Sequence, residues 1–215
     1  RAHALDRLQG RAVSGTENPD GPADPIHWHP DVRRMLMELK AFTEGGTMLL
    51  AWVCLLLDTE SRHEDESERA KAADAVALLT PVVKAFLTDE GFRMTTVAQQ
   101  VFGGAGYVAD TGVEQIVRDA RITMVYEGTT GVQALDLVGR KLAMNGGKPI
   151  RALMAELEAE ARDGPEALRD SVLDPLAAAA ADLKAAVGHF ASHGMKDPDS
   201  ALAGSVDFLH LVGHA

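Results

Sequence analysis

Apolar residues recur at three- and four-residue steps along most of this chain, which is the spacing of residues on one face of an α-helix. The clearest run begins at Asp31 and predicts a long helix to about Ser61. Its apolar positions are Val32, Met35, Leu36, Leu39, Phe42, Leu49, Leu50 and Val53. No segment shows the strict apolar–polar alternation of a half-buried strand. The pattern therefore predicts an all-α fold.

A second helical run starts near Ser67, after the acidic and polar stretch of residues 60–68. Inside this run stands the pair Thr80-Pro81. Because Pro81 has no amide hydrogen and suits the first turn of a helix, we expect a break or kink here. Thr80 would then cap a new helix that runs to Phe102.

Glycine-rich segments separate the later helices. Residues 103–111 (GGAGYVADT) predict a turn, residues 126–131 (YEGTTG) predict a second interruption, and NGGKP after Met144 predicts a helix end. We place a domain boundary at this last point. It separates a four-helix, up-and-down-type bundle at 1–145 from an additional C-terminal helical segment at 146–215. The sequence begins without a start signal and ends without a stop signal, so we expect it to be part of a longer protein.

The composition and the net charge of the chain argue against some classes of binding partner. A net charge of −11 and a pI near 5.1 oppose attraction to nucleic acid or to an anionic membrane surface. No apolar run reaches the roughly 18 residues of a membrane-spanning helix, so we expect no membrane span. The single cysteine, Cys54, lies in the apolar run LLAWVCLLL, and we expect it to be buried. A lone cysteine fits a cytoplasmic protein.

Residues 99–141 carry a motif series that is specific in order and spacing. Its elements are Gln100-x-x-Gly103-Gly104-x-Gly106-Tyr107, Val113-Glu114, Arg118-Asp119-Ala120-Arg121-Ile122 and Tyr126-Glu127-Gly128-Thr129. The series resembles the signature of the acyl-CoA dehydrogenases. The opening segment, Ala4-x-Asp6-Arg7-x-Gln9-Gly10-Arg11, is similar to the helix end that follows the β-domain in that family. The resemblance covers about residues 1–142, and the tail after residue 146 resembles the methylthiopropanoyl-CoA dehydrogenase-like subgroup.

This resemblance implies α,β-dehydrogenation of an acyl-CoA thioester with Glu127 as the base. The α-proton of a thioester is weakly acidic, so a carboxylate must lie close to it and be shielded from water. Partial burial would raise the pKa of Glu127 toward neutrality. The β-hydrogen would leave as hydride to N5 of FAD and give a trans-2-enoyl-CoA. Gly128, which lets an acyl chain approach the backbone, and Tyr126 are the candidates for contacting the substrate.

The first candidates for binding FAD flank the bundle's glycine-rich turn and its N-terminus. By resemblance, Gln100, Gly103 and Gly104 lie along the adenosine diphosphate part of the flavin in a neighbouring subunit. Arg7 with Gln9 contacts the pyrophosphate, for which a guanidinium is well suited. For the glycines, a tight interhelical turn without a ligand is the alternative interpretation.

The remaining flavin candidates, Thr129 and Gly131, follow the base. They occupy positions at which family members contact the flavin. The sequence departs from the family pattern here, because Thr130-Gly131 stands in place of the usual Ser-Gln pair. A side-chain contact at position 131 is thereby lost.

Other polar clusters are interpreted as structural. His27 and His29 alternate in a proline-bounded loop and lack the three or four ligands of a metal site, so we expect loop surface and no metal. Arg118, Asp119 and Arg121 are expected to form surface ion pairs with one another or with a neighbouring subunit.

The leading hypothesis is the C-terminal portion of an FAD-dependent acyl-CoA dehydrogenase. In isolation it is expected to be inactive, because the upstream domains that exclude water are missing. The resemblance implies an acyl-CoA substrate, a homodimer or homotetramer, and electron-transfer flavoprotein as the electron acceptor. Two alternatives stay open, an acyl-CoA oxidase-type relative and a non-catalytic helical module used for oligomerisation.

Overall fold

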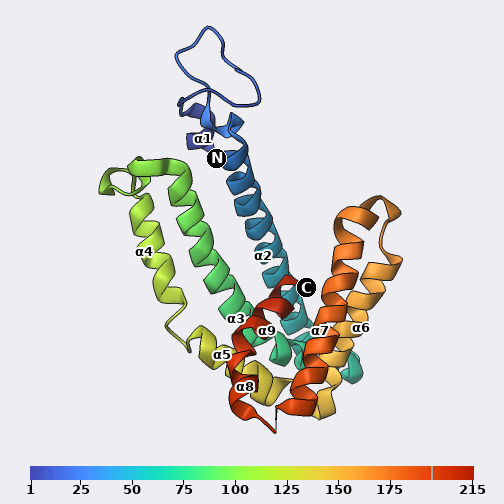
Figure 1. The fold of residues 1–215 in the computed structure, drawn as a ribbon. Helices are drawn as coiled ribbons and strands as arrows, with labels where there is room; N and C mark the ends of the chain where they lie inside the picture. The colour runs from blue at the N-terminus through green and yellow to red at the C-terminus, as the bar shows by residue number, and fades with distance from the viewer. Residues whose placement is uncertain (195) are drawn as a thin grey trace. The chain divides into compact units, whose positions relative to one another are not determined.

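The computed structural model, which describes residues 1–194 and 196–215, is mostly helical, with one long loop at residues 7–25 (Figure 1). Among the described residues the only β pairing is an isolated antiparallel bridge between Leu8 and Pro25. The α-helices are α1 (Ala2–Asp6), α2 (Pro30–Arg62), α3 (Glu66–Phe102), α4 (Val113–Thr123), α5 (Thr130–Asp136), α6 (Lys148–Asp163), α7 (Asp174–His193), α8 (Pro198–Ala203) and α9 (Ser205–His214). The predicted all-α fold is confirmed.

The described residues form two compact units. The first unit comprises Arg1–Met48 with Thr88–Val125, and the second comprises Leu49–Leu87 with Tyr126–Ala215. The first has a small core of Ala4, Ile26, Met35 and Val101. The second has a larger core, made of Leu78, Val82, Ala85, Phe86, Ala134, Leu137, Ile150, Met154, Leu183, Phe208, Leu209 and Val212. Each unit therefore has an apolar centre of its own.

Helix α3 differs from the sequence prediction at Pro81. It is one continuous helix from Glu66 to Phe102, and the predicted break is wrong. Thr80 does not cap a new helix, because its hydroxyl donates to the carbonyl of Val76 at 2.7 Å. The helix is continuous because apolar packing on both sides of the proline offsets the missing backbone hydrogen bond. Leu78 and Val82 are each only 1% exposed.

Helix α2 matches its predicted range, but most of its apolar surface is exposed. Met48, Leu55 and the thiol-bearing Cys54 all face solvent, so the predicted burial of Cys54 is wrong. Cys54 follows the buried Val53 and points about 100° away from it around the helix.

The expectation that no segment is apolar enough to span a membrane is also corrected. Helix α2 passes that test of length and composition, with only 6% of the best window buried, although one such helix is weak evidence because soluble proteins contain similar ones.

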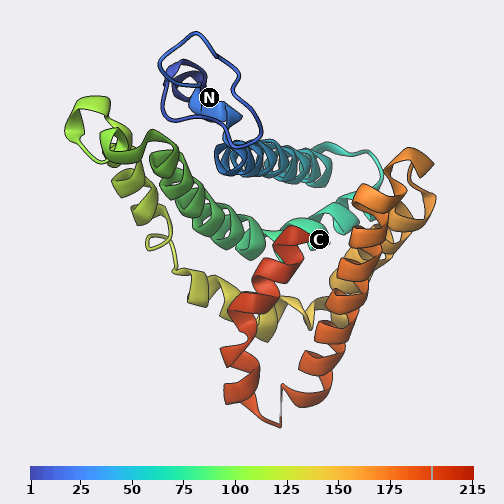
Figure 2. The ribbon, with the colours of Figure 1, turned by 45° about the horizontal axis from the view of Figure 1, so that its top comes forward.

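The C-terminal helices belong to the second unit. Helices α6 and α7 lie side by side, as both views show (Figures 1 and 2), and Lys184 of α7 pairs with Glu158 of α6 at 2.9 Å. The predicted helix to Met144 ends earlier as α5, at Asp136, and continues as a π-helical turn over Leu137–Lys141. The predicted stop at NGGKP is present. Asn145, Gly146 and Gly147 all have positive φ, a conformation that ends a helix.

Candidate functional site

Five of the predicted cofactor-binding residues line a single cavity in the first unit. The cavity has a volume of about 690 Å³. The predicted residues on its wall are Arg7, Gln9, Gln100, Gly103 and Gly104. They come from two segments that lie about ninety residues apart in the chain. The fold of this unit therefore brings the opening segment together with the glycine-rich part of the motif series.

Backbone pairing holds Arg7 and Gln9 in place. The amide of Gln9 donates to the carbonyl of Asp24 at 2.9 Å, and the amide of Ile26 donates to the carbonyl of Arg7 at 2.8 Å. His29 Nε2 lies 2.8 Å from the Gln9 carbonyl. The backbone of this strand-like segment is thus fixed, while the side chains of Arg7 and Gln9 remain exposed at the cavity.

Asp24 organises the loop behind this segment and was not singled out from the sequence. Its fully buried carboxylate accepts hydrogen bonds from the amides of Ala12 (2.9 Å), Asn18 (2.8 Å) and Glu17 (3.1 Å), and Arg11 Nη1 lies at 3.5 Å. The bonds from Ala12 and Asn18 are the main reason why the pKa of Asp24 lies below its ordinary value of 3.8. The sequence signal was weak, because the same loop contains a second aspartate, Asp20.

The double-glycine turn forms another part of the cavity wall. Helix α3 ends at Phe102, whose ring stacks on His3 of α1 with the ring centroids 4.1 Å apart. Gly103 then takes a φ of +61°. A Cβ added at Gly103 or Gly104 would meet no atom within 4 Å, so the backbone of the turn is open to an approaching group.

This cavity suits the phosphate-bearing part of a dinucleotide such as FAD. The guanidinium of Arg7 is a donor for phosphate oxygens, and Gly103 and Gly104, which have no side chain, let such a group approach the backbone of the turn closely. Gln9 and Gln100 add amide groups that donate and accept. The donor set and the open glycine backbone fit the group that the family resemblance implies.

The predicted base and its neighbours lie in the second unit, on the turn that precedes α5. Glu127 has a φ of +54° and Gly128 a φ of +89°, so two successive residues are in the left-handed region. Tyr126, Glu127 and Thr129 are exposed, and Gly131 lies in the first turn of α5. The expected partial burial of Glu127 is not provided by this chain. The walls that would shield it are not formed by the residues around the turn.

Two side chains that the sequence did not single out hold this turn. Gln133 Nε2 donates to the carbonyl of Glu127 at 3.0 Å. Lys84 Nζ donates to the carbonyl of Gly128 and lies 5.9 Å from the centroid of the Tyr126 ring. Lys84 is separated from Gly128 by 44 positions in the sequence, so no local pattern indicates its contact, whereas Gln133 lies only six positions after Glu127.

The other predicted groups have local structural partners. His27 Nδ1 lies 3.3 Å from the carbonyl of Ala4, so this ring, like that of His29, contacts the backbone. Asp119 accepts from Gln115 at 2.7 Å, and the Arg121 guanidinium lies 5.8 Å from the centroid of Phe92. Within the described part of the chain, no ion pair joins Arg118, Asp119 and Arg121 to one another, and pairing with a neighbouring subunit stays a prediction.

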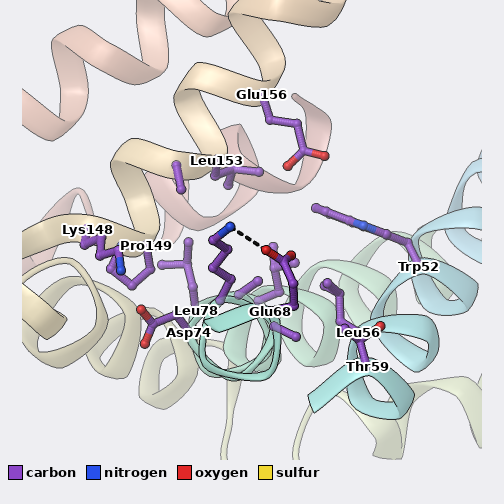
Figure 3. A pocket seen from close by; sticks show the side chains of 15 residues that line it. Trp52, Leu56, Thr59, Glu68, Asp74, Leu78, Lys148, Pro149, Leu153 and Glu156 are labelled. Carbon is purple, nitrogen blue, oxygen red and sulfur yellow. Dashed lines mark hydrogen bonds and ion pairs between the residues drawn. The ribbon is translucent and has the colours of Figure 1, made fainter. Parts of the chain in front are cut away.

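A second cavity of about 280 Å³ lies in the second unit, and none of the predicted site residues lines it. Trp52 comes from α2 and Leu153 from α6, with Leu78 of α3 at the base (Figure 3). Three of the charged side chains that line it have partners. Lys71 donates to Glu68 at 2.6 Å, the dashed pair in Figure 3, and Asp74 accepts from Asn145 at 2.6 Å.

Two family models match successive parts of the chain. Residues 5–143 match the acyl-CoA dehydrogenase C-terminal domain, and residues 149–215 match a domain described as acetyl-CoA dehydrogenase C-terminal like. The chain is 40% identical to 3-methylmercaptopropionyl-CoA dehydrogenase of Ruegeria pomeroyi, over 99% of this chain and 36% of that protein. It is 33% identical to the broad-specificity linear acyl-CoA dehydrogenase FadE5 of Mycobacterium tuberculosis, over 73% of this chain and 26% of that protein. The matched region thus spans between about a quarter and about a third of the length of these relatives.

Solved structures show the same fold. ACDH-11 of Caenorhabditis elegans in complex with C11-CoA superposes with a TM-score of 0.68 at 22% identity, over 98% of this chain and 32% of that chain. The apo form of Bd2924 gives a TM-score of 0.69 at 23% identity, over 91% of this chain and 34% of that chain. At these identities the likeness establishes the fold and nothing beyond it.

Proposed function

This chain belongs to the acyl-CoA dehydrogenase family, and on that premise we propose that it is the C-terminal portion of an FAD-dependent enzyme that dehydrogenates an acyl-CoA thioester. Glu127 is the proposed base for the α-proton. The domain division at 145/146 and a cytoplasmic location are part of the same proposal.

The observation that carries the proposal is the cavity of the first unit. Arg7, Gln9, Gln100, Gly103 and Gly104 all line it, as a phosphate-bearing flavin nucleotide requires. When bound, the flavin supplies the acceptor for the β-hydrogen, which leaves as hydride. Thr129 and Gly131 remain proposed flavin contacts on the basis of their position after Glu127.

The residues of the Glu127 turn have separate proposed tasks. The Glu127 carboxylate takes the proton from the carbon next to the thioester carbonyl. Gly128, which has no side chain, leaves room for the acyl group beside it, and Tyr126 offers an exposed aromatic surface. Glu127 is exposed in this chain. We therefore propose that other parts of the complete protein exclude water from the surroundings of its carboxylate.

The proposed substrate class follows from the relatives. Their names specify 3-methylmercaptopropionyl-CoA, linear acyl-CoA and butyryl-CoA, all of which are CoA thioesters. Electron-transfer flavoprotein is the proposed acceptor of the electrons. A homodimer or homotetramer is proposed because the exposed apolar residues of α2, including Met48, Leu50 and Leu55, require a cover.

The test replaces one residue in the complete, FAD-loaded protein. Glu127→Gln should bind FAD normally but lose anaerobic flavin bleaching by 3-methylmercaptopropionyl-CoA, butyryl-CoA and undecanoyl-CoA by about 10²- to 10⁴-fold, the usual contribution of a general base. Glu160→Gln, a matched change at an exposed position on α6, should bleach at the wild-type rate.

Other outcomes would select the alternatives. Bleaching that survives Glu127→Gln would contradict the assigned base. Rapid reoxidation of the reduced flavin by dioxygen, in place of an electron-transfer acceptor, would identify an oxidase-type relative. A complete protein that binds no FAD would be a helical oligomerisation module instead of an enzyme.

A further inference from the structure

We propose that Lys84 and Gln133 are positioning residues that hold the Glu127 turn in the conformation from which its carboxylate reaches the substrate, an inference that rests on the proposed function of Glu127. Lys84 lies on α3 and Gln133 on α5, and both belong to the second unit. Together they are called the carbonyl clamp. Neither residue belongs to the motif series in the sequence.

The two residues of the carbonyl clamp donate hydrogen bonds to two successive backbone carbonyl groups. Gln133 Nε2 donates to the carbonyl of Glu127 at 3.0 Å, and Lys84 Nζ donates to the carbonyl of Gly128. These two carbonyls define the peptide planes on either side of Gly128. Fixing both planes fixes the backbone rotation at Gly128 and the orientation of the peptide that leaves Glu127.

The turn needs such support because its backbone is strained. A φ of +54° at Glu127 is unfavourable for any residue with a Cβ atom, and such conformations persist only when surrounding contacts enforce them. At Gly128 the φ is +89°, and a Cβ there would come within 2.9 Å of Gln133 Nε2. Without the clamp, the turn would relax toward negative φ and the Cα–Cβ bond of Glu127 would point elsewhere.

Both donors are themselves restrained. Lys84 and Gln133 are half-buried side chains, and the bond from Lys84 to Gly128 is itself partly buried, which strengthens it relative to the same bond in water. The ammonium of Lys84 lies 5.9 Å from the centroid of the Tyr126 ring, within the range of a cation–π contact. One lysine thereby fixes two residues that flank Glu127, the aromatic residue before it and the glycine after it.

The test compares substitutions in the complete, FAD-loaded protein with butyryl-CoA as the probe. Lys84→Met keeps the side-chain length and removes the donor. It should lower kcat for flavin bleaching about 10- to 100-fold, since a displacement of about 1 Å can cost 10²-fold, and should leave KM nearly unchanged. Exchange of the α-proton with D2O, which reports the base without hydride transfer, should slow in parallel.

Two further variants separate positioning from general stability. Lys84→Arg keeps a cationic donor and should recover most of the lost rate. Lys71→Met, the same change on the same helix but at a residue paired with Glu68, should bleach at the wild-type rate. Gln133→Leu should lower kcat in the same way as Lys84→Met, and it decides the question if Lys84→Met does not fold.

The outcomes for the clamp and for the base are distinct. The clamp is overturned if Lys84→Met and Gln133→Leu bleach at the wild-type rate per bound flavin while Glu127→Gln is inactive. It is also overturned if the loss follows only FAD content or thermal stability and Lys84→Arg gives no recovery. If Glu127→Gln keeps full bleaching, it is the proposed function that fails.

Discussion

Asp24 illustrates how one buried carboxylate can order a loop that has no regular structure. Three backbone amides of residues 12–18 donate to it. Because hydrogen bonds from Ala12 and Asn18 favour the charged form, the pKa of Asp24 in the folded protein lies below 3.8. Its stabilising effect is therefore fully present above pH 3.8 and is lost as the pH falls through the lower, folded-state pKa.

Replacement of this carboxylate should release the loop at neutral pH. Asp24→Asn removes the negative charge that attracts Arg11. It also replaces a charged carboxylate acceptor with a neutral amide, which accepts weaker hydrogen bonds from the backbone amides. Tryptic cleavage after Arg11 should become faster, whereas Asp20→Asn, an exposed change in the same loop, should leave the rate unchanged. Equal cleavage rates for Asp24→Asn and the wild type would show that other contacts order the loop.

At the level of single residues, sequence patterns located the candidate chemistry but not its supports. Arg7, Gly103 and Gly104 could be predicted as cofactor-binding candidates because two separate family motifs mark them, and they line one cavity. Lys84 could not be predicted, because its contact with Gly128 exists only after distant segments meet. The exposure of Glu127 was also not predictable, since burial depends on which other parts of a protein surround a turn.

At the level of elements, helix positions followed from apolar spacing, and the errors occurred where packing overrode local preference. The predicted starts at Asp31 and Ser67 lie within one residue of the observed starts of α2 and α3. Pro81 favours a break when considered alone, but the buried neighbours of α3 keep the helix whole. The end of α5 at Asp136 was missed because a π-helical turn has the same composition as an α-helix.

The uninterrupted α3 leads to a quantitative expectation for Pro81→Ala. A proline inside a helix is about 3 kcal/mol less favourable than alanine. Loss of two buried methylenes costs about 1.6 kcal/mol, at about 0.8 kcal/mol each. The variant should therefore be more stable by about 1 kcal/mol in urea unfolding of the complete protein.

A second proline provides the control for this measurement. Pro149 lies in the first turn of α6, where no helical hydrogen bond is lost, and it is also buried. Pro149→Ala should consequently lose only packing and be less stable than the wild type. A destabilised Pro81→Ala variant would mean that the ring contributes more through packing than the missing hydrogen bond costs.

At the level of the whole molecule, the sequence was sufficient for the fold class and the family, while the division of the chain into compact units came from the structure. Apolar periodicity without alternation excluded a sheet, and the motif series matched a family whose model covers residues 5–143. The extent of exposed apolar surface could not be predicted. Periodicity reports which residues share a face of a helix, but not whether anything packs against that face.

Assembly of the complete protein can be followed through the exposed face of α2. If a second copy covers Met48, Leu50 and Leu55, modification of Cys54 by N-ethylmaleimide should be slow in the assembled protein and should accelerate on dilution below the dissociation concentration. Peptide mass spectrometry would measure the modified fraction. An equal rate in oligomer and monomer would place the subunit contact on another surface.

The position of that thiol has a practical use as well. Cys54 is the only sulfhydryl among these 215 residues, it stands on a regular helix, and it is neither among the residues that line the first-unit cavity nor part of the Glu127 turn. A fluorophore or spin label attached there would therefore report on the surroundings of α2 without touching the residues assigned to flavin or thioester chemistry.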